Sequence, residues 1–315
     1  MNALVSGIAS DIGFGIGRVI REWGIFNSIY GMDMHEDHAG SCVFDDTISC
    51  PAANDPTYLQ WLEKHIFDNR IGIFIPTSEA EIAKLSKLQV DTIGSCKVLI
   101  NNASLVATCL DKHETMTHLD KFGISTPKFG LLGTDFPNKY PVIVKPRSGQ
   151  GSKGIAKVIS KKDLLKIKAD NLVWQEYLSS DDNEYTIPIY RSYVSGIRMV
   201  IIKRKLVGGL TGSGEVVKDN DIYNYALKIA NVLDFQGCIN IQLRTTKSGP
   251  KLFEINPRIS STVVFRDKLG FSDLKWWISD VINLGLHEYT EPETGTKFFR
   301  GSQEYILTPE KQGSF

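Results

Sequence analysis

Short apolar runs alternate with amphipathic segments through the first hundred or so residues. We expect β-strands in the runs 3–5, 29–32, 71–75 and 97–100. Residues 16–23, which follow the first run, have the spacing of an amphipathic helix. Strands that alternate with helices predict a parallel β-sheet covered by helices. Thr77, Ser78 and Glu79 follow the third run and so mark a carboxyl-terminal sheet edge, where such folds bind ligands. The alternative is that Thr77 or Ser78 caps the next helix.

Polar side chains alternate with apolar ones in two strand-like runs late in the chain. Glu254, Asn256 and Arg258 occupy every second position of the run KLFEINPRIS, and Gln242 lies in the preceding run CINIQLR. Alternate residues of a strand point to the same face, so these side chains should emerge side by side. Mg²⁺ prefers oxygen ligands, which a carboxylate and two amides supply, and a guanidinium suits a phosphate or carboxylate. The alternative is an ordinary polar face of an antiparallel strand.

A glycine-rich basic segment, PVIVKPRSGQGSKGIAKVI, lies upstream of these runs. An apolar run ending at Lys145 is followed by Ser148, Gly149, Gly151, Ser152 and Gly154. Glycines let a backbone approach a phosphate closely, while Lys145, Arg147 and Lys153 supply positive charge. The segment is not a Walker loop, because no G-x-x-x-x-G-K-[ST] occurs and the chain resumes as a strand-like run. It predicts a hairpin whose tip covers a nucleotide, and the alternative is an exposed β-turn.

The segment VWQEYLSSDDNEYTIPIY, between these two motifs, offers groups for a nucleoside. An apolar run over 172–174 leads into the linker 175–178, and Glu184 opens another strand-like run. Adenine needs backbone donors and acceptors from an extended linker, and ribose needs a carboxylate that accepts its hydroxyl protons. Glu176 and Glu184 are the candidates for the ribose contact.

Charge and composition narrow the classes of partner. The formal net charge is +0, from 36 basic and 36 acidic residues, so neither nucleic acid nor a membrane is expected as a partner. No apolar run is long enough to span a membrane, and the first residues lack the regions of a signal peptide. We therefore expect a cytoplasmic protein. The 5 cysteines include no C-x-x-C pair, which argues against a disulfide framework or a zinc site.

Glycines near the amino terminus leave a second interpretation open. Gly13, Gly15 and Gly17 follow the first predicted strand in the run IGFGIGR, which is a local match to a dinucleotide fingerprint. A lone glycine pattern is a weak motif, and these glycines do not form one tight turn with Gly7. Dinucleotide binding is therefore the lesser alternative.

Taken in order, these motifs resemble the ATP-grasp superfamily, and within it the synthetase modules of the carbamoyl-phosphate synthetase large subunit and their single-module relatives. The resemblance extends over residues 1–285. Matched position by position, it implies ATP contacts at Lys112, Lys145, Ser148, Gly149, Gly151, Ser152, Gly154, Gln175, Glu176, Tyr177, Leu178 and Glu184. It implies magnesium ligands at Gln242, Glu254 and Asn256. Arg258 and Lys145 are implied to be catalytic: Arg258 as the basic residue that steadies the acyl phosphate, and Lys145 as the basic residue that touches the α-phosphate region.

The same resemblance implies a fold and a reaction. The expected fold class is α/β and α+β, with a parallel pre-ATP-grasp domain (1–108), a small ATP-grasp lobe (109–180) and a large lobe (181–315). ATP and Mg²⁺, with Mn²⁺ as a substitute ion, would activate a carboxylate as an acyl phosphate, and an amine would attack it to give an amide. The expected partners are small-molecule carboxylate and amine substrates, and relatives suggest a homodimer. The alternative is a nucleotide-binding regulatory protein that releases no ADP.

Three departures from the pattern of the carbamoyl-phosphate enzymes, together with two arginines, bear on the substrate. The chain has room for one module where the carbamoyl-phosphate enzymes have two, so carbamoyl phosphate is not the expected product. The stretch GGLTGSGEVVKDND lacks their His-x-Gly-Asp turn, so substrate contacts there should differ. Arg258 and Arg266 are candidates for a substrate carboxylate, unless Arg266 pairs with an acid on the helix that follows. The run FFRGSQEYIL resembles the ending of single-module relatives from bacterial surface-polysaccharide gene clusters, which suggests an amino acid or a carboxylated sugar.

Overall fold

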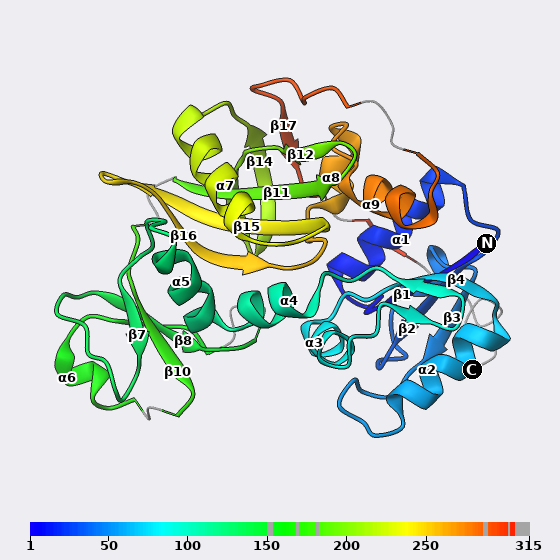
Figure 1. Cartoon of the computed structure of the whole chain (residues 1–315), viewed down its shortest axis with the longest axis horizontal. Coiled ribbons are helices and arrows are strands. Elements are labelled where there is room, and N and C mark those ends of the chain that lie inside the picture. Colours follow the sequence, from blue (N-terminus) through cyan, green and yellow to red (C-terminus); the bar gives the residue numbers. More distant parts are fainter. Residues whose placement is uncertain (150–153, 168–169, 180–182, 286–288, 302, 306–315) are drawn as a thin grey trace.

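Three β-sheets make up the framework of the protein. The computed structural model describes residues 1–149, 154–167, 170–179, 183–285, 289–301 and 303–305. Figure 1 shows the N-terminal sheet in blue and cyan, a small sheet in green, and a large sheet that is mostly lime and yellow. In the same view, α4 (Ala103–Leu110) lies between the first two sheets, and α5 (Lys112–Lys121) lies between the small sheet and the large one.

The N-terminal sheet has the strand order β3-β2-β1-β4-β6-β5 and is parallel except for its last pair. Its strands are β1 (Asn2–Ser6), β2 (Ile29–Asp33), β3 (Asp46–Ser49), β4 (Ile71–Ile75), β5 (Thr92–Ile93) and β6 (Cys96–Val98). The helices are α1 (Asp11–Trp23), α2 (Tyr58–Asp68) and α3 (Glu79–Lys87), with a 3-10 turn, η1 (Gly40–Cys42). The chain leaves β1 for β2 on one side and later adds β4 on the other. Such a switch of direction opens a crevice at the carboxyl ends of the strands.

The small sheet is antiparallel, with the order β7-β10-β8-β9. It consists of β7 (Phe129–Leu131), β8 (Val142–Pro146), β9 (Ala156–Val158) and β10 (Leu172–Glu176), with the short helix α6 (Lys161–Leu164). Strands β8 and β9 pair as a hairpin across the glycine-rich segment, which confirms the predicted return of the chain as a strand. Buried Val142, Val144 and Trp174 belong to a core cluster of this lobe alone.

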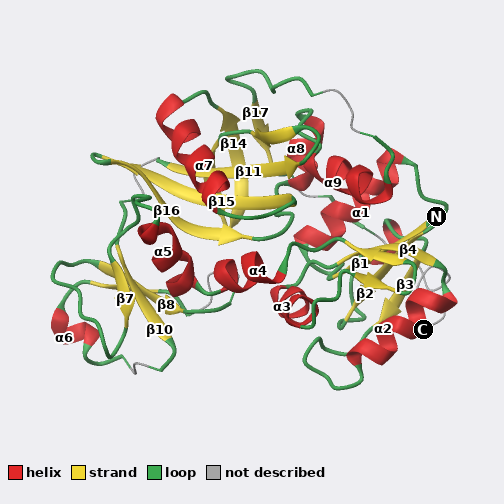
Figure 2. Ribbon diagram, in the orientation of Figure 1, coloured by secondary structure: helices red, strands yellow, loops and turns green. Residues whose placement is uncertain are grey.

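The large sheet has the order β16-β15-β11-β13-β14-β17, with β12 paired to β11. Its strands are β11 (Glu184–Ser192), β12 (Gly196–Met199), β13 (Ile202–Val207), β14 (Leu210–Val216), β15 (Gly237–Thr246), β16 (Gly249–Asn256) and β17 (Lys297–Phe299). The associated helices are α7 (Asn220–Val232), α8 (Val263–Lys268) and α9 (Asp273–Ile282), drawn in red in Figure 2. Helices α4, α5 and α7 share one core cluster with β11, β15 and β16.

A second core cluster joins the N-terminal sheet to the large sheet. Ile16 and Val19 of α1 belong to the same buried cluster as Val263 of α8 and Trp276 and Trp277 of α9. The two tryptophans are thus packing residues, as their position on an apolar helical face predicts. The predicted fold class, a parallel N-terminal sheet followed by two antiparallel lobes, is confirmed. The domain boundaries remain a proposal, because α5 lies in the predicted small lobe but packs on the large one.

No helix among the described residues is long and apolar enough to cross a membrane.

Candidate functional site

A cavity of about 940 Å³ lies where the three sheets meet. Its walls come from the carboxyl ends of the N-terminal strands, from the small sheet, and from one face of the large sheet. Most of the predicted ATP and metal residues line it: Lys112, Lys145, Gly149, Gln175, Glu176, Tyr177, Leu178, Glu184, Gln242, Glu254, Asn256 and Arg258. The fold therefore gathers residues that are far apart in the sequence around one space.

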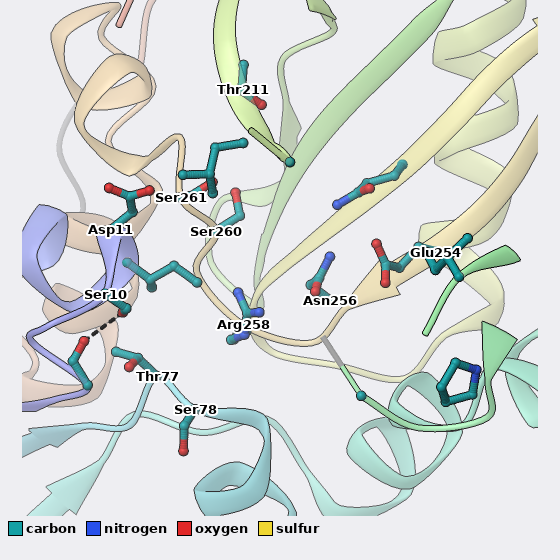
Figure 3. A pocket seen from close by; sticks show the side chains of 18 of the residues that line it. Ser10, Asp11, Thr77, Ser78, Thr211, Glu254, Asn256, Arg258, Ser260 and Ser261 are labelled. Atoms are coloured by element: carbon teal, nitrogen blue, oxygen red, sulfur yellow. Dashed lines mark hydrogen bonds between the residues drawn. The ribbon is translucent and has the colours of Figure 1, made fainter. Parts of the chain in front are cut away.

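The predicted metal ligands lie on neighbouring strands of the large sheet. Gln242 on β15 pairs with Glu254 on β16, and Asn256 pairs with Asn240 two positions further along. Strand β16 ends at Asn256, so Arg258 follows the strand instead of continuing it as the alternation predicted. Figure 3 shows Arg258 between Asn256 on one side and the residues of the N-terminal domain on the other. The side chains still converge on the same cavity.

Arg258 is held by a carboxylate that the sequence did not assign to it. The guanidinium lies 3.6 Å from Glu79, the first residue of α3 in the N-terminal domain. Burial lowers the pKa of Arg258, while Glu79 and Glu254 act against the shift. Burial likewise raises the pKa of Glu79, and Arg258 and Lys112 oppose that rise. The ion pair thus connects the N-terminal domain to the end of β16.

Two lysines bring positive charge to the small-lobe wall. Lys145 donates hydrogen bonds to the side chain of Gln175 at 2.8 Å and to the carbonyl of Phe253 at 3.1 Å, so it bridges the small lobe and β16. Its pKa is lowered to about 8, chiefly by burial, with Glu254 opposing the shift and nearby Lys112 adding to it. Lys112 begins α5 and donates to the Gly149 carbonyl at 2.8 Å. Charge interactions link Lys145 with Glu254 and Lys112 with Glu79.

The glycine-rich hairpin is described only at its two ends. Gly149 lines the cavity, whereas Ser148 and Gly154 do not. The predicted contacts at Gly151 and Ser152 lie outside the described residues. These assignments therefore stay predictions of the sequence.

Arg147 near the start of the hairpin donates to Asp111 at 3.1 and 3.2 Å. Asp111 is also the N-cap residue of α5, accepting from the backbone N–H groups of His113 and Glu114. Burial raises the pKa of Asp111, but the hydrogen bond from Arg147 and the cap bonds outweigh it and leave the pKa lowered. Arg147 is thus a structural residue that fixes the hairpin on the helix, and it does not line the cavity.

The linker predicted to hold adenine runs along the wall between the two lobes. Its backbone is extended by contacts on both sides: the N–H of Glu176 donates to the Lys128 carbonyl at 2.6 Å, and the Leu178 carbonyl accepts from Arg244 at 2.6 Å. The carboxylate of Glu176 accepts from Lys251 at 2.8 Å, so this acid ties the linker to β16. Ile143 and Phe253 add apolar surface to the same part of the cavity. An apolar slot with backbone polar groups at its rim suits a planar base.

Glu184 lies in the cavity wall, but two arginines occupy its carboxylate. Arg204 of β13 donates to one oxygen at 3.1 and 2.8 Å, and Arg244 of β15 donates to the other at 3.0 and 2.6 Å. Arg204 also donates to the Gln242 side-chain oxygen at 2.8 Å. A ribose hydroxyl or a metal ion would therefore compete with Arg204 for these two predicted ligands. Neither arginine was predicted as a site residue, although Arg244 is two residues from Gln242 on one strand face.

Arg266 does not reach the cavity. It is fully buried and pairs with Asp273 in the first turn of α9, with bonds of 3.2 and 2.8 Å. It also donates to the hydroxyls of Ser260 and Thr262 at 2.8 and 2.6 Å. The local ion pair, which was one of its two predicted roles, is thus confirmed. Similarly, Ser78 caps α3 by accepting from the Glu81 N–H at 3.2 Å.

The glycines of the local dinucleotide pattern pack the helix α1. Gly13, Gly15 and Gly17 all lie inside α1, not in a turn that holds phosphates. A Cβ on Gly13 would lie 2.4 Å from the Gly7 carbonyl oxygen, and one on Gly17 would lie 2.3 Å from the ring of Phe44. Close approach of a helix to a strand and to a side chain explains these glycines. The dinucleotide interpretation has no support in this geometry.

The donor set around Glu254 fits a magnesium ion better than a zinc ion. The described residues contain no group of three or more His, Cys, Asp or Glu side chains suited to a metal. Glu254 and Asn256 instead offer one carboxylate and one amide, with Gln242 beside them. Mg²⁺ commonly takes one or two carboxylates and completes its shell with phosphates and water. Such a set suits an ion that arrives with a nucleotide.

The three sheets define a class of protein. A parallel sheet, a small antiparallel lobe with a glycine-rich hairpin, and a large antiparallel lobe that meet at one cavity are the parts of the ATP-grasp fold. Residues 168–297 match a family model described as ATP-grasp in the biosynthetic pathway with Ter operon.

Solved structures give the same fold over nearly the whole chain. The protein is similar to the N5-carboxyaminoimidazole synthetase from Staphylococcus aureus complexed with ADP, with a TM-score of 0.74, 16% identity, and coverage of 93% of this chain and 79% of that one. The N5-carboxyaminoimidazole ribonucleotide synthetase from Thermus thermophilus matches with a TM-score of 0.71 and 16% identity, over 93% of this chain and 81% of that one. The L-amino acid ligase from Bacillus licheniformis matches with a TM-score of 0.67 and 16% identity, over 89% of this chain and 74% of that one. At these identities the likeness establishes the ATP-grasp fold.

Proposed function

We propose that the protein is an ATP- and Mg²⁺-dependent ligase that activates a carboxylate as an acyl phosphate and joins it to an amine. The observation that carries the proposal is the arrangement across the cavity: Lys145 and Lys112 face Glu254, Asn256 and Arg258. The names of the similar structures, which are synthetases and an amino acid ligase, agree with it.

Each group has a role in binding ATP. The apolar slot at Ile143 and Phe253 takes adenine, with the linker 175–178 beside it. Lys145 and Lys112 bind phosphate oxygens, because they are the cations of the small-lobe wall. Glu254 and Asn256 would hold Mg²⁺, with Gln242 joining once Arg204 releases its amide oxygen. When bound there, Mg²⁺ would supply neutralisation of the phosphate charge.

The reaction then needs positioning and charge stabilisation more than a protein nucleophile. A carboxylate oxygen of the substrate attacks the γ-phosphorus, the bond to the β-phosphate oxygen breaks, and ADP leaves. Arg258, beside Glu254, stabilises the negative charge of the acyl phosphate. The amine nitrogen attacks the carbonyl carbon, phosphate leaves, and the nitrogen loses a proton.

The test is the release of ADP and phosphate from ATP and Mg²⁺ across a matrix of carboxylates and amines. We expect release that depends on a carboxylate and rises with an amine. Glu254→Gln keeps the shape and removes the charge, so we expect kcat to fall about a hundredfold or more. Glu215→Gln is the matched control, since Glu215 lies in the same lobe and does not line the cavity.

Nucleotide binding separates the two candidate functions. Tight binding of ATP without ADP release, for every carboxylate in the matrix, would contradict the ligase and favour a regulatory nucleotide-binding protein. Equal loss of activity in Glu254→Gln and Glu215→Gln would argue against the assigned metal site.

A further inference from the structure

One end of the cavity is lined by hydroxyl groups. We call it the hydroxyl compartment and define it by Ser10, Thr77, Thr211, Ser260 and Ser261, all of which line the cavity. These residues come from the start of α1, the end of β4, β14 and the loop that follows β16. Figure 3 shows Ser260 and Ser261 near Arg258, with Asp11 and Ser10 beside them and Thr77 below. The compartment thus adjoins the guanidinium assigned to the acyl phosphate.

Three of the five hydroxyls are committed to the protein. Ser10 donates to the Gly7 carbonyl at 2.6 Å, and Thr77 donates to the Ser6 carbonyl at 2.8 Å. Ser260 lies 3.2 Å from the Asn240 oxygen and accepts from Arg266 at 2.8 Å. These bonds set the shape of the compartment, because they fix the loops that bound it.

Thr211 and Ser261 keep hydrogen-bonding capacity for a ligand. A hydroxyl has one donor and two acceptor sites. The Thr211 hydroxyl accepts one long bond of 3.5 Å from Arg204, so its own proton is still available. The Ser261 hydroxyl bonds to no other described residue. The carboxylate of Asp11, on the first turn of α1, adds an acceptor for hydroxyl protons at the same end.

A residue outside the cavity holds these groups in place. Arg300, which directly follows β17, donates to the Thr211 carbonyl at 3.0 Å and to the Ser261 carbonyl at 3.1 Å. Its guanidinium also lies 3.6 Å from Asp11. One planar fork therefore fixes β14, the loop after β16 and the start of α1 relative to one another. Arg300 thus holds Thr211, Ser261 and Asp11 in fixed relative positions before a ligand binds.

From this geometry we propose that the carboxylate substrate is polyhydroxylated, as in a sugar acid. Its carboxylate lies toward Arg258 and Glu254, and its hydroxyls bind Thr211, Ser261 and Asp11. An apolar acid in the same place would leave these polar groups desolvated and unpaired, which is the kind of mismatch that gives strong discrimination. The inference rests on the proposed function, since it names the substrate class of the same site.

Hydroxylamine tests the substrate class without knowledge of the natural amine. Its nitrogen attacks the acyl phosphate, phosphate leaves, one proton is lost, and the hydroxamate is measured as its iron complex. The full-length protein with ATP and Mg²⁺ is given sugar acids, D-galacturonate and D-gluconate, and shape-matched plain acids, cyclohexanecarboxylate and hexanoate. L-Alanine is included as a small amino acid. We expect kcat/KM for at least one sugar acid to exceed that for its matched plain acid by a hundredfold or more.

Two variants connect the preference to the compartment. Ser261→Ala and Thr211→Val each remove one hydroxyl, and we expect each to lower kcat/KM for the sugar acid about tenfold. The value for the plain acid and the KM for ATP should stay unchanged. Ser213→Ala is the matched control, because Ser213 lies on β14 two residues from Thr211 but does not line the cavity. A variant that simply folds poorly would lower the rates for both acids equally.

The outcomes separate this inference from the proposed function. Hydroxamate formed from plain acids or L-alanine as fast as from sugar acids would overturn the inference and leave the ligase intact. Equal losses for both acids in Ser261→Ala and Thr211→Val, in variants that keep the free energy of unfolding of the wild type, would also overturn it. Binding of ATP without hydroxamate from any acid would count against both.

Discussion

At Lys145, burial and a neighbouring carboxylate shift the pKa in opposite directions. Its side chain is buried between the small sheet and β16, and burial lowers its pKa to about 8 although Glu254 acts in the other direction. A cation in a water-poor site binds phosphate more strongly than an exposed one, but it also loses its proton more easily. The charge of Lys145 therefore depends on pH within the range in which enzymes are assayed.

The pH dependence of ATP use follows from that pKa. Only protonated Lys145 attracts phosphate, so kcat/KM for ATP should fall about tenfold per pH unit above pH 8. Lys145→Arg keeps a positive charge through this range, and we expect its profile to stay flat even if its maximum is lower. The measurement is kcat/KM for ATP from pH 6 to 10. A break at the same pH in the arginine variant would assign it to another group.

Glu81 gives a prediction about stability. It is buried in the N-terminal domain, accepts hydrogen bonds from Ser6 and Tyr58, and has a pKa that burial raises to about 7 although those bonds lower it. The folded state therefore holds a proton that the unfolded state releases near pH 4.5. The contribution of Glu81 to the free energy of unfolding therefore falls as the pH rises from 4.5 to 7. Above pH 7 the buried carboxylate is charged, and its full destabilising effect is present.

A substitution that removes the Glu81 carboxylate should abolish this pH-dependent loss of stability. We expect Glu81→Gln to gain stability relative to the wild type as the pH rises from 5 to 8, by about 2–3 kcal/mol. The measurement is the free energy of unfolding in urea at both pH values. A difference between the two proteins that does not change with pH would contradict the raised pKa.

Single site residues were predictable from the sequence where they lie on the same strand. Alternation on a strand was enough to group Glu254 with Asn256, because the period of a strand is fixed. It did not reveal that Arg204 bonds Glu184 and Gln242, since neighbours across a sheet depend on strand order. The contact of Glu79 with Arg258 was hidden for the same reason, because it joins two domains.

Helix α1 shows at the scale of elements how packing overrides local preference. Glycine disfavours a helix by about 1 kcal/mol relative to alanine, yet α1 contains three. At Gly13 the neighbouring atoms belong to the backbone at Gly7 and Ser6, which cannot move aside, whereas at Gly15 they are the methyl groups of Val263 and Val264. Gly13 therefore allows contact with the end of β1 and the residue after it, whereas Gly15 allows contact with α8.

Two alanine substitutions distinguish these contacts. A Cβ at Gly13 would lie 2.4 Å from a backbone oxygen, so we expect Gly13→Ala to destabilise the protein by about 2 kcal/mol or more despite the better helix residue. At Gly15 the nearest atom is a valine methyl at 3.1 Å, and the gain in helix preference should keep Gly15→Ala within about 1 kcal/mol of the wild type. Urea unfolding measures both. Equal effects would show that the packing at Gly13 is looser than described.

Elements were predictable where their residues were apolar. The strands at 71–75 and 142–144 match apolar runs, so their burial was evident from the sequence. Strand β3 was missed because its residues, Asp46–Ser49, are mostly polar and it pairs at the sheet edge. The start of α1 was placed at residue 16, since glycines between 11 and 17 mask a helix whose cap is Ser10.

On the scale of the whole molecule, the buried apolar clusters connect the N-terminal domain to the large lobe, whereas the small lobe has its own cluster. One buried cluster runs from the N-terminal sheet through α1 into α8 and α9, and another fills the large lobe. The small lobe has a separate cluster. Its ties to β16 are polar: Lys145 to the Phe253 carbonyl and Lys251 to Glu176. The Lys251–Glu176 ion pair is partly exposed and contributes little stability, so we expect the small lobe to be held less firmly than the other two parts.

Hydrogen exchange should reveal this division and its response to ATP. Without nucleotide, we expect the amides of β8 and β10 to exchange faster than those of β1, β11 and β15, because the small lobe has a small core cluster of its own. A non-hydrolysable ATP analogue with Mg²⁺ binds both walls of the cavity, so it should slow exchange in β8 and β10 and leave β1 unchanged. Lys145→Ala should lose most of this slowing, while Lys297→Ala, on the exposed strand β17, should retain it. Uniform slowing over all three sheets would instead mean that the protein opens as a single cooperative unit.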